Sequence, residues 1–181
     1  MLEKNGITDI SPKALFVFFE QNKNLDTNSQ AYKSVVKTLN YLERAFNEKI
    51  RELGKPSWII TLYLLTSYLL KNYVMDGKEG VLKSFFINFF QEVLRSTEVG
   101  DSELIKFNLA ISRGTTSKEN IRLRHEIIFR RFLIYAKNLV PLDPKRDYTE
   151  DEKIAIFRMY GGKCQRCGET LEMTSFHVHH K

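Results

Sequence analysis

The sequence predicts a mainly α-helical fold followed by a short C-terminal segment of a different kind. Of the 181 residues, 43% are hydrophobic and 12% aromatic, so the chain is neither disordered nor of low complexity and has enough apolar side chains for a core. Only 9 glycines and 4 prolines are present, too few for a chain built from tight β-turns. Apolar residues recur at the helical period over most of the chain, and this pattern changes only after about residue 148.

The first helices are marked by their start and stop signals. Ser11 is placed to cap a short helix that runs through Glu20, and Pro12 is tolerated at its first position. A second, amphipathic helix is expected to run through residue 53, where Gly54 is placed to end it. Its apolar positions are Val35, Val36, Leu39, Leu42, Phe46, Ile50 and Leu53.

The next stretch is the most apolar of the chain. The run WIITLYLLTSYLL, residues 58–70, lies in a helix expected over residues 56–74. It has 13 residues, short of the roughly 20 needed to span a bilayer, so we interpret it as a buried core helix and expect no membrane partner. A third apolar face, ending near Gly100, is formed by Leu82, Phe85, Phe86, Phe89, Phe90 and Val93, and a weaker helix is expected over residues 102–111.

The last long helix carries most of the basic charge. Thr116 and Glu119 have the spacing of a capping box, which predicts a helix over about residues 117–139. Its apolar stripe consists of Ile121, Ile128, Phe132 and Tyr135, and the arginines that lie mostly off it are Arg122, Arg124, Arg130 and Arg131. Such a run is either a solvated face or a nucleic-acid-binding face, and guanidinium groups match phosphate geometry well.

Charge and cysteine usage narrow the partner and the compartment. The net charge is +6, and residues 113–147 hold nine Lys and Arg against four Asp and Glu, a local net charge of 9 − 4 = +5. A basic stretch of this kind suits a polyanion such as DNA. The N-terminal residues MLEKNGITDI lack the layout of a signal peptide, which predicts a cytoplasmic protein. The charge pattern leaves open whether the chain forms a homo-oligomer.

Two prolines predict a boundary between two parts of the chain. Pro141 and Pro144 interrupt helix, so we expect a helical domain over residues 1–140, a linker over 141–148 and a second unit over 149–181. The second unit opens with another capping box, made by Thr149 and Glu152. Its helix is expected to reach about Tyr160, where Gly161 and Gly162 stop it.

The second unit then presents two cysteines and three histidines. Cys164 and Cys167 have the C-x-x-C spacing at which a tight loop directs two thiolates at one metal ion, although a pair of reduced thiols is the plainer alternative. In a strand, His177 and His179 lie on one face and His180 on the other. Nine residues separate Cys167 from His177, fewer than the roughly 12 of a Cys2His2 finger, and the interleaved residues differ from an expression tag.

Taken together, the last 34 residues, YTEDEKIAIFRMYGGKCQRCGETLEMTSFHVHHK, resemble the first half of an HNH endonuclease domain of the McrA-like type. The resemblance implies a ββα-metal module, incomplete in these residues, that hydrolyses DNA phosphodiester bonds. It implies that His180 is the general base, that His179 binds the catalytic Mg²⁺ or other divalent cation, and that Cys164 and Cys167 supply half of a structural zinc site. It assigns no firm role to His177.

Later motifs of that family, an Asn, a second His and a second C-x-x-C, are not among the 181 residues, so we expect these residues alone to be inactive as a nuclease. The helical part is loosely similar to the helical region of restriction proteins that join a ParB-like domain of the GmrSD kind to an HNH nuclease. The resemblance thus implies a role in restriction or phage defence. Two alternatives stay open: a non-catalytic zinc-containing nucleic-acid-binding module, and a helical interaction domain whose aromatic face at residues 85–90 pairs with a partner.

Overall fold

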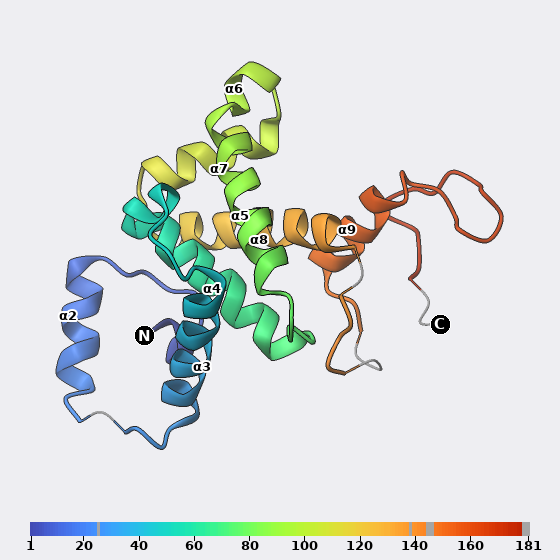
Figure 1. The fold of residues 1–181 in the computed structure, drawn as a ribbon. Coiled ribbons are helices and arrows are strands. Elements are labelled where there is room, and N and C mark those ends of the chain that lie inside the picture. The colour runs from blue at the N-terminus through green and yellow to red at the C-terminus, as the bar shows by residue number, and fades with distance from the viewer. Residues whose placement is uncertain (25, 138, 144–146, 179–181) are drawn as a thin grey trace.

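A computed structural model describes residues 1–24, 26–137, 139–143 and 147–178, and it is mainly helical (Figure 1). The helices are α1 (Leu2–Asn5), α2 (Pro12–Gln21), α3 (Gln30–Ala45), α4 (Pro56–Asn72), α5 (Glu79–Leu94), α6 (Ser96–Val99), α7 (Ser102–Ser112), α8 (Lys118–Ala136) and α9 (Glu150–Met159), with a 3-10 turn η1 (Arg51–Gly54). The prediction of a mainly α fold is confirmed. In the described part of the chain, extended pairing is limited to isolated bridges, and no sheet forms.

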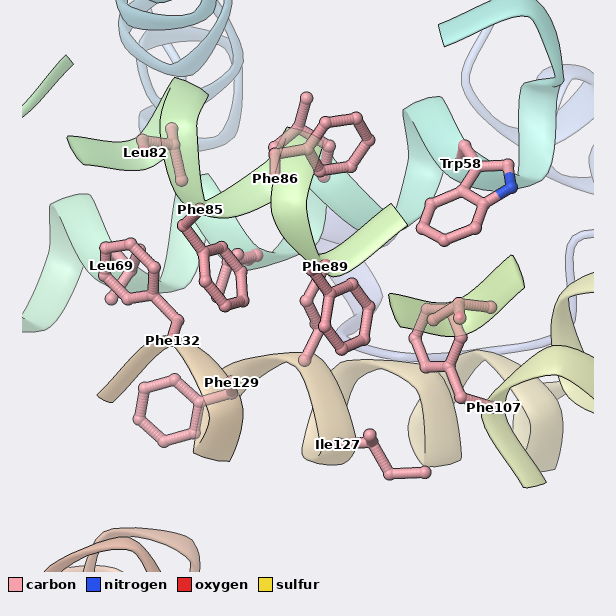
Figure 2. Close-up of a cluster of buried hydrophobic side chains, with 14 of the residues drawn as sticks. Trp58, Leu69, Leu82, Phe85, Phe86, Phe89, Phe107, Ile127, Phe129 and Phe132 are labelled. Carbon is pink, nitrogen blue, oxygen red and sulfur yellow. The ribbon is translucent and has the colours of Figure 1, made fainter. Parts of the chain in front are cut away.

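The core is an aromatic cluster enclosed by α4, α5, α7 and α8 (Figure 2). The Trp58 ring of α4 lies 4.8 Å from the ring of Phe90 and 5.4 Å from that of Phe107, measured between centroids. Phe85 of α5 meets Phe132 of α8 edge to face at 5.1 Å. Such pairs add about 0.5–1.5 kcal/mol each beyond the area they bury. The core is therefore fixed by ring geometry as well as by apolar area.

The two most apolar stretches of the chain both lie in the core. The run at residues 58–70 lies in α4 and contributes much of the core, as predicted, and no helix in the described residues is long and apolar enough to cross a membrane. Phe85, Phe86 and Phe89 are buried inside the protein. The aromatic face at residues 85–90 is thus used within the fold, which removes the support for a partner-binding role there.

Several helix boundaries differ from the prediction, among them the end of α8, which lies at Ala136 rather than near residue 139. The helix expected through residue 53 ends at Ala45, because Phe46 leaves helical geometry and its ring packs on Phe86 with centroids 5.7 Å apart. Core packing thus overrides the continuing apolar period. At the start of α8 the cap is Ser117, whose hydroxyl accepts the Asn120 amide at 3.3 Å, rather than Thr116.

The N-terminus is tied to the body by one carboxylate. Glu3 accepts hydrogen bonds from Ser34 at 3.0 Å and from Tyr63 at 2.8 Å, as well as from Ser67, and it pairs with Lys71 at 2.5 Å. Burial alone raises the pKa of Glu3, but these donors outweigh it and lower the pKa below its usual value. Helix α2, by contrast, has no buried residue and stands apart from the other helices in Figure 1.

The chain after α8 returns along the end of α4. The Val74 amide donates to the Val140 carbonyl at 2.9 Å, and the Leu142 amide donates to the Asn72 carbonyl at 2.8 Å. Pro141, which has no N–H, lies between these two bonds and bridges Tyr73. The described part of the predicted linker is therefore paired with the helical body, and α9 follows it to pack against α8.

Candidate metal and nucleic-acid site

The two cysteines lie on a short hairpin directly after α9. The helix ends where Gly161 and Gly162 both adopt left-handed conformations, with φ of 60° and 65°. Lys163 then pairs with Thr170 in an isolated antiparallel bridge. Glycine is suited to these positions, because a side chain at positive φ is strained. The GlyGly pair thus turns the chain sharply from the helix into the hairpin, as the sequence predicted.

Backbone hydrogen bonds shape the cysteine turn. The Cys164 amide donates to the Glu169 carbonyl at 2.8 Å, and the Gly168 amide donates back to the Cys164 carbonyl at 2.8 Å. Gly168 has φ of 78°, which lets the chain leave the turn immediately after Cys167. The turn therefore brings both thiols to the same end of the hairpin, with Cys167 exposed and Cys164 partly exposed.

The Cys164 sulfur lies in a setting that favours its thiolate. The backbone N–H groups of Cys167 and Arg166, followed by the Cys167 thiol, lower the pKa of Cys164 below its usual value. Thiolates are the form in which cysteine binds metal, and N–H donors directed at sulfur stabilise the negative charge. These two side chains therefore fit a thiophilic cation such as Zn²⁺ and would supply two of its four usual ligands.

The remaining predicted ligands are not part of this cluster in the described chain. No group of three or more His, Cys, Asp or Glu side chains converges among the described residues, so exposed His177 does not join the cysteines. His179 and His180 lie outside the described residues. Phe176 lies against Phe157 of α9, with ring centroids 5.4 Å apart, and this contact brings the chain before the histidines back to the helix.

The four arginines of α8 do not form one solvent-facing surface. Arg122 is exposed and pairs with Glu126 of the same helix at 2.7 Å. Arg130 pairs with Glu103 at 2.7 Å and Asp151 at 2.6 Å, and Arg131 pairs with Asp101 at 2.6 Å. Arg124, predicted to contact nucleic acid, is instead fully buried with no exposed surface.

The prediction of a shared phosphate-binding face is thus corrected for Arg124, because a guanidinium with no exposed surface cannot reach a nucleic-acid backbone. Arg130 and Arg131 are engaged by acids from neighbouring helices. Two cations that the charge analysis did not single out, Lys163 and Arg166, are exposed on the cysteine turn itself. Neither forms an ion pair with another described residue.

Sequence reasoning also missed the acids that organise this region. Glu103 of α7 pairs with Arg130, with Arg131 at 3.3 Å and with Arg158 of α9 at 2.9 Å. Burial alone raises the pKa of Glu103, but bonds from Arg130 and Arg158 outweigh it and hold the pKa below its usual value. The pairing of residues 27 to 55 positions apart leaves no local signal in the sequence.

A buried contact completes the attachment of α9. The Tyr73 hydroxyl donates to Glu152, whose other carboxylate oxygen accepts from the Thr149 amide at 2.7 Å and the Thr149 hydroxyl at 2.9 Å. The capping box predicted from Thr149 and Glu152 is therefore confirmed, and its carboxylate has a second role as an anchor to α4. Together these contacts fix where α9 presents the cysteine turn.

Neither protein-family models nor curated proteins nor solved structures give a match to this chain.

Proposed function

We propose that this protein acts on DNA as a metal-dependent endonuclease of the HNH kind, with a role in restriction or phage defence. The observation that carries the proposal is the cysteine turn, in which Cys164 and Cys167 lie together after a helix and two left-handed glycines. The order of helix, GlyGly, C-x-x-C and hairpin is the order that the HNH resemblance requires. The N–H groups directed at Cys164 suit a thiolate that binds metal.

In this proposal Cys164 and Cys167 hold half of a structural zinc site and fix the hairpin. His180 takes the proton of the attacking water, a task suited to a neutral imidazole. His179 would bind the catalytic Mg²⁺ or similar cation, which supplies charge to hold the phosphate and stabilise the leaving oxygen. Lys163 and Arg166 on the turn, rather than the buried Arg124, contact the DNA backbone.

The metal part of the proposal is tested by cobalt substitution. The chain contains only two cysteines, so a thiolate-to-Co²⁺ absorption band reports on Cys164 and Cys167 alone. We expect the wild-type protein to give this band and to retain zinc by elemental analysis, and the Cys164→Ser variant to lose both. His177→Ala serves as the matched control and keeps the band. A wild-type protein that binds neither ion overturns the zinc site.

Because the 181 residues lack the family's Asn, second His and second C-x-x-C, we expect no cleavage by them alone. The catalytic part is therefore tested on a longer protein that also carries these motifs, with supercoiled plasmid and Mg²⁺ or Mn²⁺. Cleavage that is abolished in His180→Ala, and reduced in His179→Ala, supports the roles given to these residues. Cleavage that survives His180→Ala removes His180 as the base. Zinc binding and DNA binding without cleavage favour the second candidate function, a non-catalytic nucleic-acid-binding module, which the exposed cations beside the cysteines also suit.

DNA contact at the cysteine turn is tested by the salt dependence of DNA affinity. Each phosphate contact that is lost lowers the slope of log affinity against log salt by about one unit. We expect Lys163→Ala and Arg166→Ala each to weaken DNA binding and flatten this slope. Lys33→Ala, which removes an exposed lysine on α3, should leave it unchanged. Unaltered slopes in both turn variants would show that the turn does not touch DNA.

A further inference from the structure

Arg124 is a buried cation that no acidic residue neutralises. Its side chain lies in α8 with no exposed surface. One nitrogen, Nη2, donates to the Thr115 carbonyl at 2.8 Å, whereas Nε and Nη1 have no hydrogen-bond partner among the described residues. Burial lowers the pKa of Arg124 to about 10, which still leaves the guanidinium charged at neutral pH. An unpaired charge in this position is strongly unfavourable.

No acidic side chain of the protein pairs with this charge in the described arrangement. The residues outside the described part are Leu25, Asn138, Pro144, Lys145, Arg146, His179, His180 and Lys181, and none of them has an acidic side chain. Every Asp and Glu therefore lies in the described part, and none forms an ion pair with Arg124 there. An anion from outside the chain would supply the missing negative charge.

The surroundings of Arg124 favour an anion. Its guanidinium reaches back to the Thr115 carbonyl in the loop in front of α8, and the start of a helix carries partial positive charge. From Arg113 to Arg124 the chain has four Lys and Arg and a single acid, Glu119. We propose that Arg124 and the loop Thr115–Ser117 form a buried site for a small oxyanion of the phosphate class.

The structure also indicates how an anion would enter. The Ile10 amide donates to the Thr116 carbonyl at 3.0 Å, next to the Thr115 carbonyl that Arg124 holds. Ile10 is the one buried residue among those described before Thr38, and α2 behind it buries none. Little apolar burial therefore holds the strap around Ile10 against this loop. Because Arg124 has no exposed surface, an anion can reach it only when a neighbouring segment opens, and we expect this strap to be that segment.

The test measures thermal stability of the full chain in phosphate, in sulfate and in chloride of matched ionic strength. At phosphate about ten times above Kd, a stabilisation of about 3 °C is expected for a chain of this size, with a similar effect of sulfate and none of chloride. Arg124→Met should melt higher than the wild type without phosphate and show no phosphate response. Arg122→Met, on the exposed side of the same helix, keeps the wild-type response.

A second variant and a second readout guard against misfolding. Arg124→Lys retains a charge in a smaller donor, so phosphate should raise its melting temperature by less than that of the wild type. Hydrogen exchange of the Ile10 amide should slow when phosphate binds, because an anion bound to Arg124 and the loop stabilises the closed strap. Absence of a phosphate effect in the wild type, or an equal effect in Arg124→Met, overturns the proposal. In the second case phosphate binds surface cations only.

Discussion

The helical body and the C-terminal segment are held together by different kinds of contact. In the body, four helices share an aromatic core in which Phe86 and Phe107 are fully buried. The segment from α9 onward attaches instead through polar groups: Tyr73 to Glu152, Arg130 to Asp151 and Arg158 to Glu103. Apolar burial supplies stability without much direction, whereas charged pairs and hydrogen bonds fix orientation. The body is therefore the stable platform, and the polar contacts set how it presents the cysteine turn.

The largest effect should come from the core of the body. Replacing Phe107 by Ala removes a ring that packs against Trp58 and Phe89, and we expect the free energy of unfolding to fall by about 3–5 kcal/mol. Urea denaturation followed by tryptophan fluorescence measures this loss, since Trp58 is the one tryptophan of the chain. Phe16→Ala on α2, where the side chain is 67% exposed, should change it by less than about 0.5 kcal/mol. Equal losses would mean that α2 belongs to the core.

The partly buried imidazole of His125 tests how dry the interior of the helical body is, because its Nδ1 atom is buried. His125 stacks on Phe129, its Nδ1 has no partner among the described residues, and burial lowers its pKa to about 4. Between about pH 6.5 and 4 the unfolded chain binds a proton that the folded chain does not, so stability falls as the pH falls through this window. The loss attributable to His125 reaches about 3 kcal/mol near pH 4.

Other acidic groups titrate in the same range, so the measurement is a difference. Urea midpoints of wild type and His125→Phe are compared from pH 7.5 to 4, and the variant should lose less stability on acidification. His177→Phe replaces an exposed histidine and should follow the wild-type curve. Parallel curves for wild type and His125→Phe would contradict a depressed pKa at this site.

The buried anchor of the C-terminal segment should give a smaller and more local effect. Tyr73→Phe removes the hydroxyl that donates to the Glu152 carboxylate, and a lost hydrogen bond to a charged group costs about 1.5–3 kcal/mol. We expect α9 to exchange its amide hydrogens faster while those of α5 stay protected. Loss of protection throughout the chain would show that the body and the segment unfold as one unit.

Disrupting the ion-pair network around Glu103 should destabilise the protein somewhat less. Glu103→Gln weakens contacts to Arg130, Arg131 and Arg158, and because the group is partly buried we expect a loss of about 1–2 kcal/mol. The matched control is Glu126→Gln, which removes one exposed pair with Arg122 and should cost about 0.3–0.5 kcal/mol. Added salt should reduce the loss in Glu126→Gln by a larger fraction than the loss in Glu103→Gln, since the Glu103 pairs are less exposed and less screened. Equal losses in the free energy of unfolding would show that the Glu103 pairs contribute no more than an exposed surface pair.

The sequence predicted well those features that depend on neighbours along the chain. The helical class, the core role of residues 58–70, the Thr149 capping box and the GlyGly stop all follow from local periodicity or turn chemistry. Ile121, Ile128 and Phe132 also lie on the buried face of α8, as their spacing predicted, whereas Tyr135, the fourth residue of that stripe, is exposed.

The predictions that were wrong share a physical reason, which is contact between residues far apart in the sequence. The apolar period continues past Ala45, but the packing of Phe46 on Phe86 ends α3, and such a contact between distant helices has no local pattern. The arginines of α8 look solvent-facing by spacing, yet Arg130 and Arg131 pair with acids from elsewhere in the chain. These acids are Glu103 of α7, Asp101, which caps α7, and Asp151 of α9. For the site, the sequence placed both cysteines on one turn, while the roles of His179 and His180 stay predictions.

The smallest effect on stability is expected from substitutions of the two glycines before the cysteine turn, and it should stay local to that turn. Gly161→Ala and Gly162→Ala both place a side chain at positive φ, which costs about 1 kcal/mol. At Gly161 a new Cβ meets open space, whereas at Gly162 it would lie 2.9 Å from Cζ of Phe157, the ring that holds Phe176. We therefore expect Gly162→Ala to weaken Co²⁺ binding and the protection of the Leu171 amide more than Gly161→Ala does. The Leu171 amide is the relevant probe because it donates to the Gly162 carbonyl at 2.7 Å. The urea midpoint of the helical body should be the same in both variants. A lower midpoint in Gly162→Ala alone would mean that the cysteine turn also stabilises the aromatic core.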